Sequence, residues 1–274
     1  MSERPLPWFA AGHDPGPSFF ELLRRAAPDA LTTAGSGDGD ASRASSPSIP
    51  HGTTVVALRY ADGVVMGGDR RATEGLTIAG RRMEKVQPAD RWSGVAIAGA
   101  AGPAMELVRL FQTELEHYEK VEGEPLSLDG KANRLSQMVR GNLPAAMQGF
   151  VVVPLFAGFD RQRQRGRLFK YDVTGGRYEE LDFHATGSGS VHARNWMKAS
   201  WREDMSADEA IELVLRSLLH AADEDAGTGG ADLIRGIYPT VSTISDVGYA
   251  DVPEEAIAEA VRGILDALAE GGNG

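Results

Sequence analysis

Thr53 is the residue of this chain with the clearest potential for chemistry, provided that the chain is cut directly before it. Residues 51–54, His-Gly-Thr-Thr, stand where a leader rich in Gly, Ser and Pro gives way to the β-forming run 55–58. Cleavage between Gly52 and Thr53 would place a free α-amine beside the Thr53 hydroxyl. An α-amine has a pKa of about 7.7–8.0, so near neutral pH it can take the hydroxyl proton and activate the oxygen for acyl transfer. Taken alone, the same residues also fit a loop that enters a strand.

Asp69 and Lys85 follow Thr53 at two equal intervals of sixteen residues. A lysine ammonium lowers the pKa of a nearby amine or hydroxyl, and a carboxylate beside it would hold it in place and balance its charge. The alternative for Asp69 and Lys85 is a surface ion pair, which would contribute less than about 1 kcal/mol. Whether Lys85 or the Thr53 amine takes the hydroxyl proton stays open at this stage.

Two predicted strand pairs would bring these three residues together. Residues 54–60 and 64–68 are predicted to be two strands. They are joined through Asp-Gly, a dipeptide that favours tight hairpin turns. The second strand would then end with Asp69 near the start of the first. Segments 76–80 and 82–86 are predicted to form another strand pair, which would carry Lys85 to the same place.

The composition limits the classes of function. With 274 residues, 42% of them apolar, the chain can bury the core of one globular domain and an appendage. It has no cysteine, which excludes disulfides, thiolate catalysis and Cys-built metal sites, and the histidines show no metal-ligand spacing. A net charge of −11 argues against nucleic-acid binding. Without a signal sequence or an apolar run that spans a bilayer, we expect a cytoplasmic protein with no membrane contact.

The leader differs in composition from the rest of the chain. Residues 32–48 are almost entirely Gly, Ser, Ala, Asp and Thr, with little apolar surface to bury. Residues 19–25 could form a short amphipathic segment that docks on a partner during assembly. We therefore predict that residues 1–52 are a removable prosegment, largely disordered, and that residues 53–274 form the catalytic domain.

Beyond residue 100, helical and strand patterns alternate in blocks. Helices are predicted from 103 and from about 129, strands at 151–159 and 167–173, helices after 189 and over 206–222, a strand at 237–244 and a helix at 254–268. This order fits neither a parallel βαβ repeat nor an all-β fold. It predicts an α+β protein with two antiparallel sheets packed face to face and helices on both outer faces, a four-layer α-β-β-α sandwich.

Two glycine-containing motifs occur late in the chain, Gly-Ser-Gly at 187–189 and Asp-x-x-Thr-Gly-Gly at 225–230. Together with Thr53, Asp69 and Lys85 in this order, they resemble the β subunits of proteasomes. That resemblance implies the fold of the N-terminal-nucleophile hydrolases, which is the same four-layer sandwich. It also implies a threonine endopeptidase that cuts its own chain between Gly52 and Thr53.

The resemblance assigns roles to further residues. Ser188 and Asp225 match the positions that hydrogen-bond the threonine amine, and Thr228 stands where the family often has Ser. Gly99 matches the position whose backbone N–H receives the developing oxyanion. The backbones of Thr73 and Ala101 match positions that pair with an extended substrate peptide. The pocket for the substrate residue that precedes the cleaved bond would be lined by four side chains: Ala72, Met83, Ile97 and Ala101.

A large leader and a mature part of 222 residues resemble the bacterial, actinobacterial-type proteasome. This implies that the chain assembles with α subunits and with copies of itself in stacked seven-membered rings. A ring-shaped ATPase would act through the α ring and deliver unfolded or tagged polypeptides, and no cofactor or metal is implied. Three alternatives stay open: a subunit of the two-ring bacterial ATP-dependent protease, a structural ring subunit that never matures, and a small-molecule amidase.

Overall fold

The computed structural model describes residues 52–75 and 77–271 of this chain. The predicted prosegment up to residue 51, with the amphipathic segment 19–25 and His51, lies outside the described residues. Along the described part, no helix is both long and apolar enough to cross a membrane. The fold below is therefore that of the predicted catalytic domain.

The first sheet carries the start of this domain. Its five antiparallel strands stand in the order β10-β1-β2-β11-β12. Their bounds are β1 (Thr54–Tyr60), β2 (Gly63–Gly68), β10 (Phe183–Gly187), β11 (Thr240–Ser245) and β12 (Gly248–Asp251). β1 and β2 form the predicted hairpin, with Val55 opposite Gly68, so Asp69 follows at the end where β1 begins.

The second sheet is also five-stranded and antiparallel, in the order β5-β6-β7-β8-β9. Its strands are β5 (Val86–Asp90), β6 (Ser93–Gly99), β7 (Val152–Asp160), β8 (Arg165–Tyr171) and β9 (Arg177–Glu180). A separate two-stranded sheet joins β3 (Ala72–Glu74) to β4 (Thr77–Gly80). This small sheet lies in the connection between Asp69 and Lys85.

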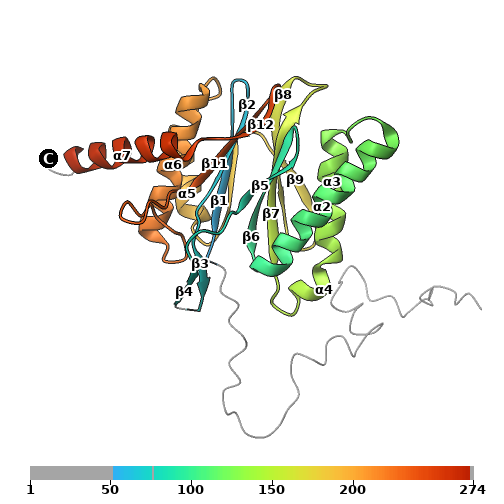
Figure 1. Ribbon diagram of the computed structural model, residues 1–274, viewed down its shortest axis with the longest axis horizontal. Helices are drawn as coiled ribbons and strands as arrows, with labels where there is room; N and C mark the ends of the chain where they lie inside the picture. Colours follow the sequence, from blue (N-terminus) through green and yellow to red (C-terminus); the bar gives the residue numbers. More distant parts are fainter. Residues whose placement is uncertain (1–51, 76, 272–274) are drawn as a thin grey trace, which may run out of the picture. The chain divides into compact units, whose positions relative to one another are not determined.

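Helices cover the outer face of each five-stranded sheet (Figure 1). On the first sheet lie α5 (Ser190–Ser200) and α6 (Ala207–Glu224), and α7 (Glu254–Gly271) packs against α6 and projects outward. On the second sheet lie α2 (Ala101–Glu122) and α3 (Leu128–Gly141), and the short α4 (Leu143–Ala146) packs against α3. Buried side chains from the inner faces of both sheets pack against each other, among them Val55, Ala57, Met66, Leu155 and Leu168. The predicted α+β four-layer α-β-β-α sandwich is confirmed.

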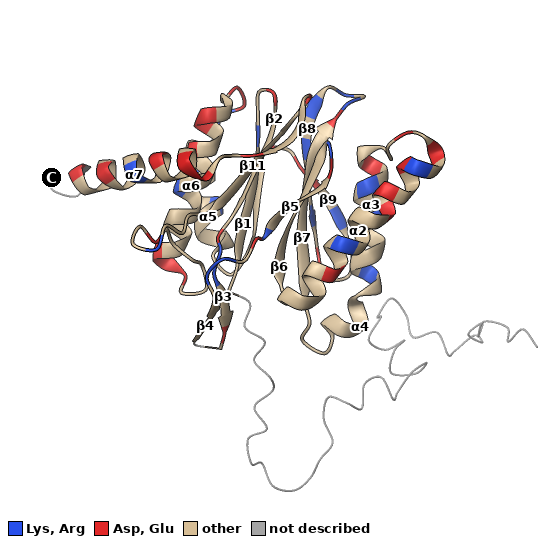
Figure 2. Cartoon of the chain, in the orientation of Figure 1, with Lys and Arg blue, Asp and Glu red and all other residues tan. Residues whose placement is uncertain are grey.

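Local sequence signals explain where the helices begin, end and face. In α2, Leu107, Phe111 and Leu115 recur at helical spacing and are buried, and the helix ends at Gly123 with φ of +76°. Ser206 is the N-cap of α6, and its hydroxyl forms a capping box with the Glu209 carboxylate. Charged residues gather on the outer helices and on the strand ends, while the strands between them are mostly uncharged (Figure 2).

One predicted strand pair is wrong. Segment 76–80 does not pair with 82–86, because β4 pairs with β3, and Val86 begins β5, which pairs with β6. Residues 81–85 are instead a connection from β4 of the two-stranded sheet to β5 of the second sheet. β5 contains Pro88, and as an edge strand it tolerates a proline. The short strands β3, β9, β10 and β12 were not predicted.

Candidate active site

The Thr53 hydroxyl lies beside the peptide bond that precedes it. Thr53 is 5% exposed and immediately precedes β1. Its Oγ1 donates a hydrogen bond of 2.7 Å to the carbonyl oxygen of Gly52. Its own carbonyl oxygen accepts the backbone N–H of Ser188 at 2.8 Å. The predicted nucleophile is thus held against the bond that it is predicted to cut.

The start of β1 can lie close to the end of β10 only because residue 187, opposite it in the sheet, is a glycine. Gly187 has φ of +104°, and a Cβ on it would lie only 1.9 Å from the Thr53 carbonyl oxygen. A side chain at this position would therefore push the start of β1 away from β10. The glycine before Ser188 is required so that the two strand ends can approach.

Asp69 and Lys85 form an ion pair in the interior. Both side chains are fully buried, and Lys85 Nζ donates to Asp69 Oδ1 at 2.7 Å. The same oxygen accepts the Thr54 N–H at 2.8 Å, while Oδ2 accepts the N–H groups of Arg71 at 2.9 Å and Gly229 at 2.8 Å. The surface ion pair that was the alternative for these residues does not describe this arrangement.

Lys85 also reaches the peptide bond before Thr53. Its Nζ donates to the Gly52 carbonyl oxygen at 3.3 Å. Burial lowers the pKa of Lys85 below its ordinary value, although the charge and hydrogen bond of Asp69 act in the opposite direction. A buried ammonium at this distance can polarise the carbonyl and stabilise negative charge on its oxygen.

Ser188, Asp225 and Thr228 form a second group next to Thr53. The hydroxyls of Ser188 and Thr228 donate to Asp225 Oδ2 at 2.5 and 2.6 Å, and the Gly227 N–H donates to Oδ1 at 3.2 Å. Ser188 Oγ lies 3.4 Å from the Thr53 backbone nitrogen, which donates to it. Burial pushes the pKa of Asp225 up, but the hydrogen bonds outweigh burial and hold this pKa below its usual value. Thr228, found where the family often has Ser, directs its hydroxyl at Asp225.

The residues with predicted substrate contacts lie on β3, on β6, at the start of α2 and in the connection 81–85. Thr73 on β3 accepts the Gly52 N–H through Oγ1 at 3.2 Å. Ile97 on β6 is buried, and the half-buried Met83 packs against the same apolar cluster. Ala72 is half-buried next to Thr73 on β3, and Ala101 is exposed as the first residue of α2.

Gly99 ends β6, directly before the turn into α2. Its φ is +112°, and an added Cβ would lie 2.1 Å from the carbonyl oxygen of Val151. Only glycine fits this backbone conformation and this close approach. The backbone of Gly99 is therefore set by the junction of β6, α2 and β7.

Three groups of the site were missed at the sequence level, the N–H groups of Arg71 and Gly229 and the side chain of Thr54. The first two act through the backbone, which no side-chain pattern reveals. Thr54 is fully buried, and its hydroxyl contacts Gly189 N and Thr228 Oγ1. The second threonine of the pair 53–54 could have been predicted as a further residue of the site, because it directly follows the proposed nucleophile.

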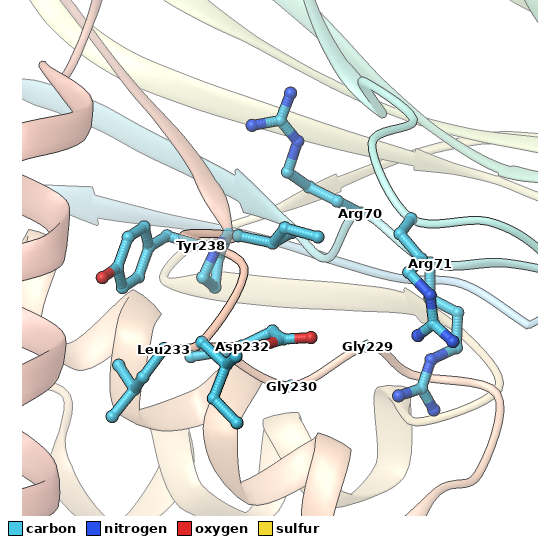
Figure 3. Close-up of a pocket in the computed structure, with 12 residues that line it drawn as sticks. Arg70, Arg71, Gly229, Gly230, Asp232, Leu233 and Tyr238 are labelled. Atoms are coloured by element: carbon cyan, nitrogen blue, oxygen red, sulfur yellow. The ribbon is translucent and has the colours of Figure 1, made fainter.

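A cavity of about 450 Å³ is lined in part by Arg71 and Gly229 (Figure 3). Arg70 and Arg71 lie on one side of it, and Leu233 and Tyr238 on the other. The Arg71 side chain donates to the Ala226 carbonyl oxygen at 2.9 Å. None of the site residues predicted from the sequence lines this cavity, but Arg71 and Gly229, whose N–H groups bind Asp69, do.

Comparisons with known proteins agree on one family. The family model described as Proteasome subunit matches residues 49–234. Over 267 residues the chain is 53% identical to "Proteasome subunit beta" of Acidimicrobium ferrooxidans, a match that covers 97% of this chain and 96% of that protein. Over 217 residues it is 57% identical to "Proteasome subunit beta" of Streptomyces griseus subsp. griseus, covering 79% of this chain and 77% of that protein. The family match spans every candidate residue from Gly52 to Thr228.

Proposed function

Because the chain belongs to the proteasome subunit family, we propose that Thr53 is its nucleophile and that cleavage of the Gly52–Thr53 bond makes it active. The chain is a β-type subunit of the proteasome core, and such subunits are threonine peptidases that assemble into rings with α subunits. One observation carries the proposal, the contact of Thr53 Oγ1 and Lys85 Nζ with the same Gly52 carbonyl oxygen, at 2.7 and 3.3 Å.

In the proposed self-cleavage, Thr53 Oγ attacks the Gly52 carbonyl carbon. The Gly52–Thr53 C–N bond breaks as an ester forms on Oγ, and the proton from the hydroxyl ends on the freed nitrogen. Water then hydrolyses the ester, which releases the leader as a carboxylate and restores the Thr53 hydroxyl. Lys85 stabilises the negative charge that develops on the Gly52 oxygen, and Asp69 holds the ammonium in place.

In the proposed hydrolysis of substrates, the freed Thr53 amine takes the hydroxyl proton. Ser188 and Asp225, with Thr228 donating to Asp225, hold and orient that amine. Oγ attacks the substrate carbonyl, and the Gly99 N–H receives the oxyanion. The leaving amine departs with a proton, an acyl-enzyme remains, and water hydrolyses it. Lys85, charged beside Asp69, lowers the pKa of the hydroxyl and the amine.

The proposed substrate is an extended, unfolded polypeptide. The backbones of Thr73 and Ala101 would pair with it as an added strand. The side chains of the pocket before the cut are apolar, which favours an apolar or aromatic residue at that position: Ala72, Met83, Ile97 and Ala101. Rings of seven copies, a ring-shaped ATPase that acts through the α ring, tagged substrates and a cytoplasmic location belong to the same proposal.

Two of the alternatives fit the observations less well. A structural subunit that never matures has no need of a buried Asp69–Lys85 pair directed at the Gly52 carbonyl. The two-ring bacterial protease carries almost no leader, whereas the match to the Acidimicrobium protein covers 97% of this chain.

The decisive experiment is intact-mass measurement of the chain co-expressed with its α subunit, together with hydrolysis of a peptide amide. We expect a species that begins at Thr53 and is active. Thr53→Ala is expected to keep the leader and to lose hydrolysis, while Thr113→Ala, at an exposed position of α2, behaves as the wild type. Size-exclusion chromatography checks that Thr53→Ala assembles. A mature species that begins elsewhere, or hydrolysis by assembled Thr53→Ala, would refute the proposal.

A further inference from the structure

Thr54 connects the two halves of the site. Its backbone N–H donates to Asp69 Oδ1 at 2.8 Å, the oxygen that also binds Lys85. Its hydroxyl oxygen accepts the Gly189 N–H at 3.0 Å and lies 2.6 Å from Thr228 Oγ1. The side chain is fully buried. Thr54 thus touches the Asp69–Lys85 pair through its backbone and the group around Asp225 through its hydroxyl.

The direction of these hydrogen bonds follows from counting protons. A hydroxyl has one proton, and that of Thr228 is donated to Asp225 Oδ2 at 2.6 Å. Between Thr54 and Thr228, the donor must therefore be Thr54. The Gly189 N–H supplies the bond that the Thr54 oxygen accepts. The result is a chain of donors that runs from Gly189 through Thr54 and Thr228 to the Asp225 carboxylate.

The two hydroxyls pack tightly against Gly189. A Cβ on Gly189 would lie 2.5 Å from Thr228 Oγ1 and 2.6 Å from Thr54 Oγ1. The two hydroxyls therefore occupy the space that a side chain at 189 would fill. Thr228 is fully buried as well, so water does not compete for these bonds.

We propose that Thr54 is a positioning residue whose hydroxyl, acting through Thr228, holds the Asp225 carboxylate in place against Ser188, the side chain that contacts the Thr53 nitrogen. This inference rests on the proposed role of Thr53. When donors act in sequence, each bond polarises the next, so the Thr54 hydroxyl strengthens the bond that Thr228 gives to Asp225. Without it, Thr228 can turn away, and Asp225 loses one of the hydrogen bonds that hold its pKa low.

The experiment compares Thr54→Val, which keeps the shape and removes the hydroxyl, with Thr54→Ser, which keeps the hydroxyl. Both are made in the full chain co-expressed with its α subunit. The readouts are the rate of leader removal by intact mass, kcat and KM for a peptide amide, and the pH profile of kcat/KM. Ser217→Ala is the matched control, because Ser217 is a fully buried hydroxyl that donates to Leu213 O within α6.

For Thr54→Val we expect kcat to fall about 2- to 10-fold, the effect of one hydrogen bond, with KM unchanged. The acid limb of the pH profile, which reports the Thr53 amine, is expected to move to lower pH, because an Asp225–Ser188 pair that is held less firmly stabilises the protonated amine less. His192 also influences the pKa of Asp225, but it is the same in every variant. Thr54→Ser is expected to restore both the rate and the profile, and Ser217→Ala to leave the profile in place.

Three results would overturn the inference. The first is a Thr54→Val enzyme with wild-type kcat and pH profile. The second is a loss of kcat with an unmoved acid limb, which would indicate packing alone. The third is failure of Thr54→Ser to recover activity. If Thr54→Val does not fold, Thr54→Ala, which also removes the hydroxyl, is judged by the same criteria. A wild-type chain that neither matures nor hydrolyses would instead refute the proposed function.

Discussion

At the scale of single residues, the space around the Cα of Gly52 limits what can precede the nucleophile. A Cβ at this position would lie 2.5 Å from Thr73 Oγ1, 2.7 Å from the Gly227 carbonyl oxygen and 2.8 Å from the Gly227 Cα. Two of these three atoms belong to backbone, which cannot turn aside as a flexible side chain can. Even the smallest side chain must therefore displace the carbonyl of residue 52 from Thr53 and Lys85.

We accordingly predict that Gly52→Ala slows leader removal by at least about tenfold, since a small misplacement of reacting atoms costs orders of magnitude in rate. The measurement is a time course of intact mass during assembly. Gly102→Ala is the control, because no atom lies within 4 Å of a Cβ added in that helix position. Equal maturation rates for the two variants would show that the close contacts at residue 52 do not position the carbonyl.

The same scale shows what side-chain types can and cannot predict. Thr53, Asp69 and Lys85 could be selected because their chemistry requires those residue types, and the structure brings all three together. The N–H groups of Arg71 and Gly229 could not be selected, because any residue except proline carries such a donor. Thr54 was assigned to a strand, and only the fold brings its hydroxyl to a residue 174 positions away.

At the scale of elements, turn chemistry was a better guide than strand propensity. The Asp-Gly turn predicted the β1–β2 hairpin, and with it the position of Asp69. The connection that carries Lys85 was predicted as a strand because it lies among strand-forming residues. Its conformation is set by long-range bonds, Met83 N–H to Arg70 O at 3.1 Å and Ile97 N–H to Lys85 O at 2.9 Å. Local sequence does not encode such partners.

Arg167 joins three elements through buried charge. On β8 it is 3% exposed, and it donates to Asp160 at the end of β7 at 3.0 Å, to Asp129 on α3 at 2.7 Å and to Glu179 on β9 at 2.6 Å. Asp129 and Glu179 are partly exposed and can be solvated when Arg167 is removed, but Asp160 is buried. Asp160 would keep two backbone N–H donors and Arg163 at 3.8 Å, but it would lose its buried charged partner, which would destabilise the second sheet.

For Arg167→Met we therefore predict a loss of about 3 kcal/mol in the free energy of unfolding, as is typical when one partner of a buried ion pair is removed. Urea unfolding of the unassembled subunit measures this loss. Arg202→Met is the control, because its pair with Glu209 is exposed and is expected to contribute less than about 1 kcal/mol. Equal stabilities for the two variants would mean that the network around Arg167 is not stabilising.

At the scale of the whole molecule, the four-layer sandwich could be predicted because the order of helical and strand blocks restricts the possible architectures. The pairing of β1 with β10 could not, since the partners are more than a hundred residues apart and β10 has a weak strand pattern. This pairing nevertheless completes the site, because Gly187 at the end of β10 leads directly to Ser188. A feature of the global fold thus decides which residues surround Thr53.

The stability of the whole domain should also depend on pH through His184. This β10 residue is largely buried, and burial lowers its pKa to about 4, with Lys170 and Arg194 acting in the same direction and Glu180, 3.7 Å away, opposing them. In the unfolded chain the pKa is about 6.5, so as the pH falls the unfolded state binds the proton first. Stability contributed by the neutral imidazole is then lost between pH 6.5 and 4.

We predict that this loss reaches at most about 3 kcal/mol, because each pKa unit corresponds to about 1.4 kcal/mol. Replacing the imidazole in His184→Gln should flatten the pH dependence of the unfolding free energy over that interval, measured by urea unfolding at several pH values. His117→Gln, on the exposed side of α2, controls for the replacement of a histidine. Because carboxylates also contribute to acid unfolding, the relevant quantity is the difference between wild type and variant. A constant difference from pH 7 to pH 4 would show that His184 takes up its proton equally in the folded and unfolded states.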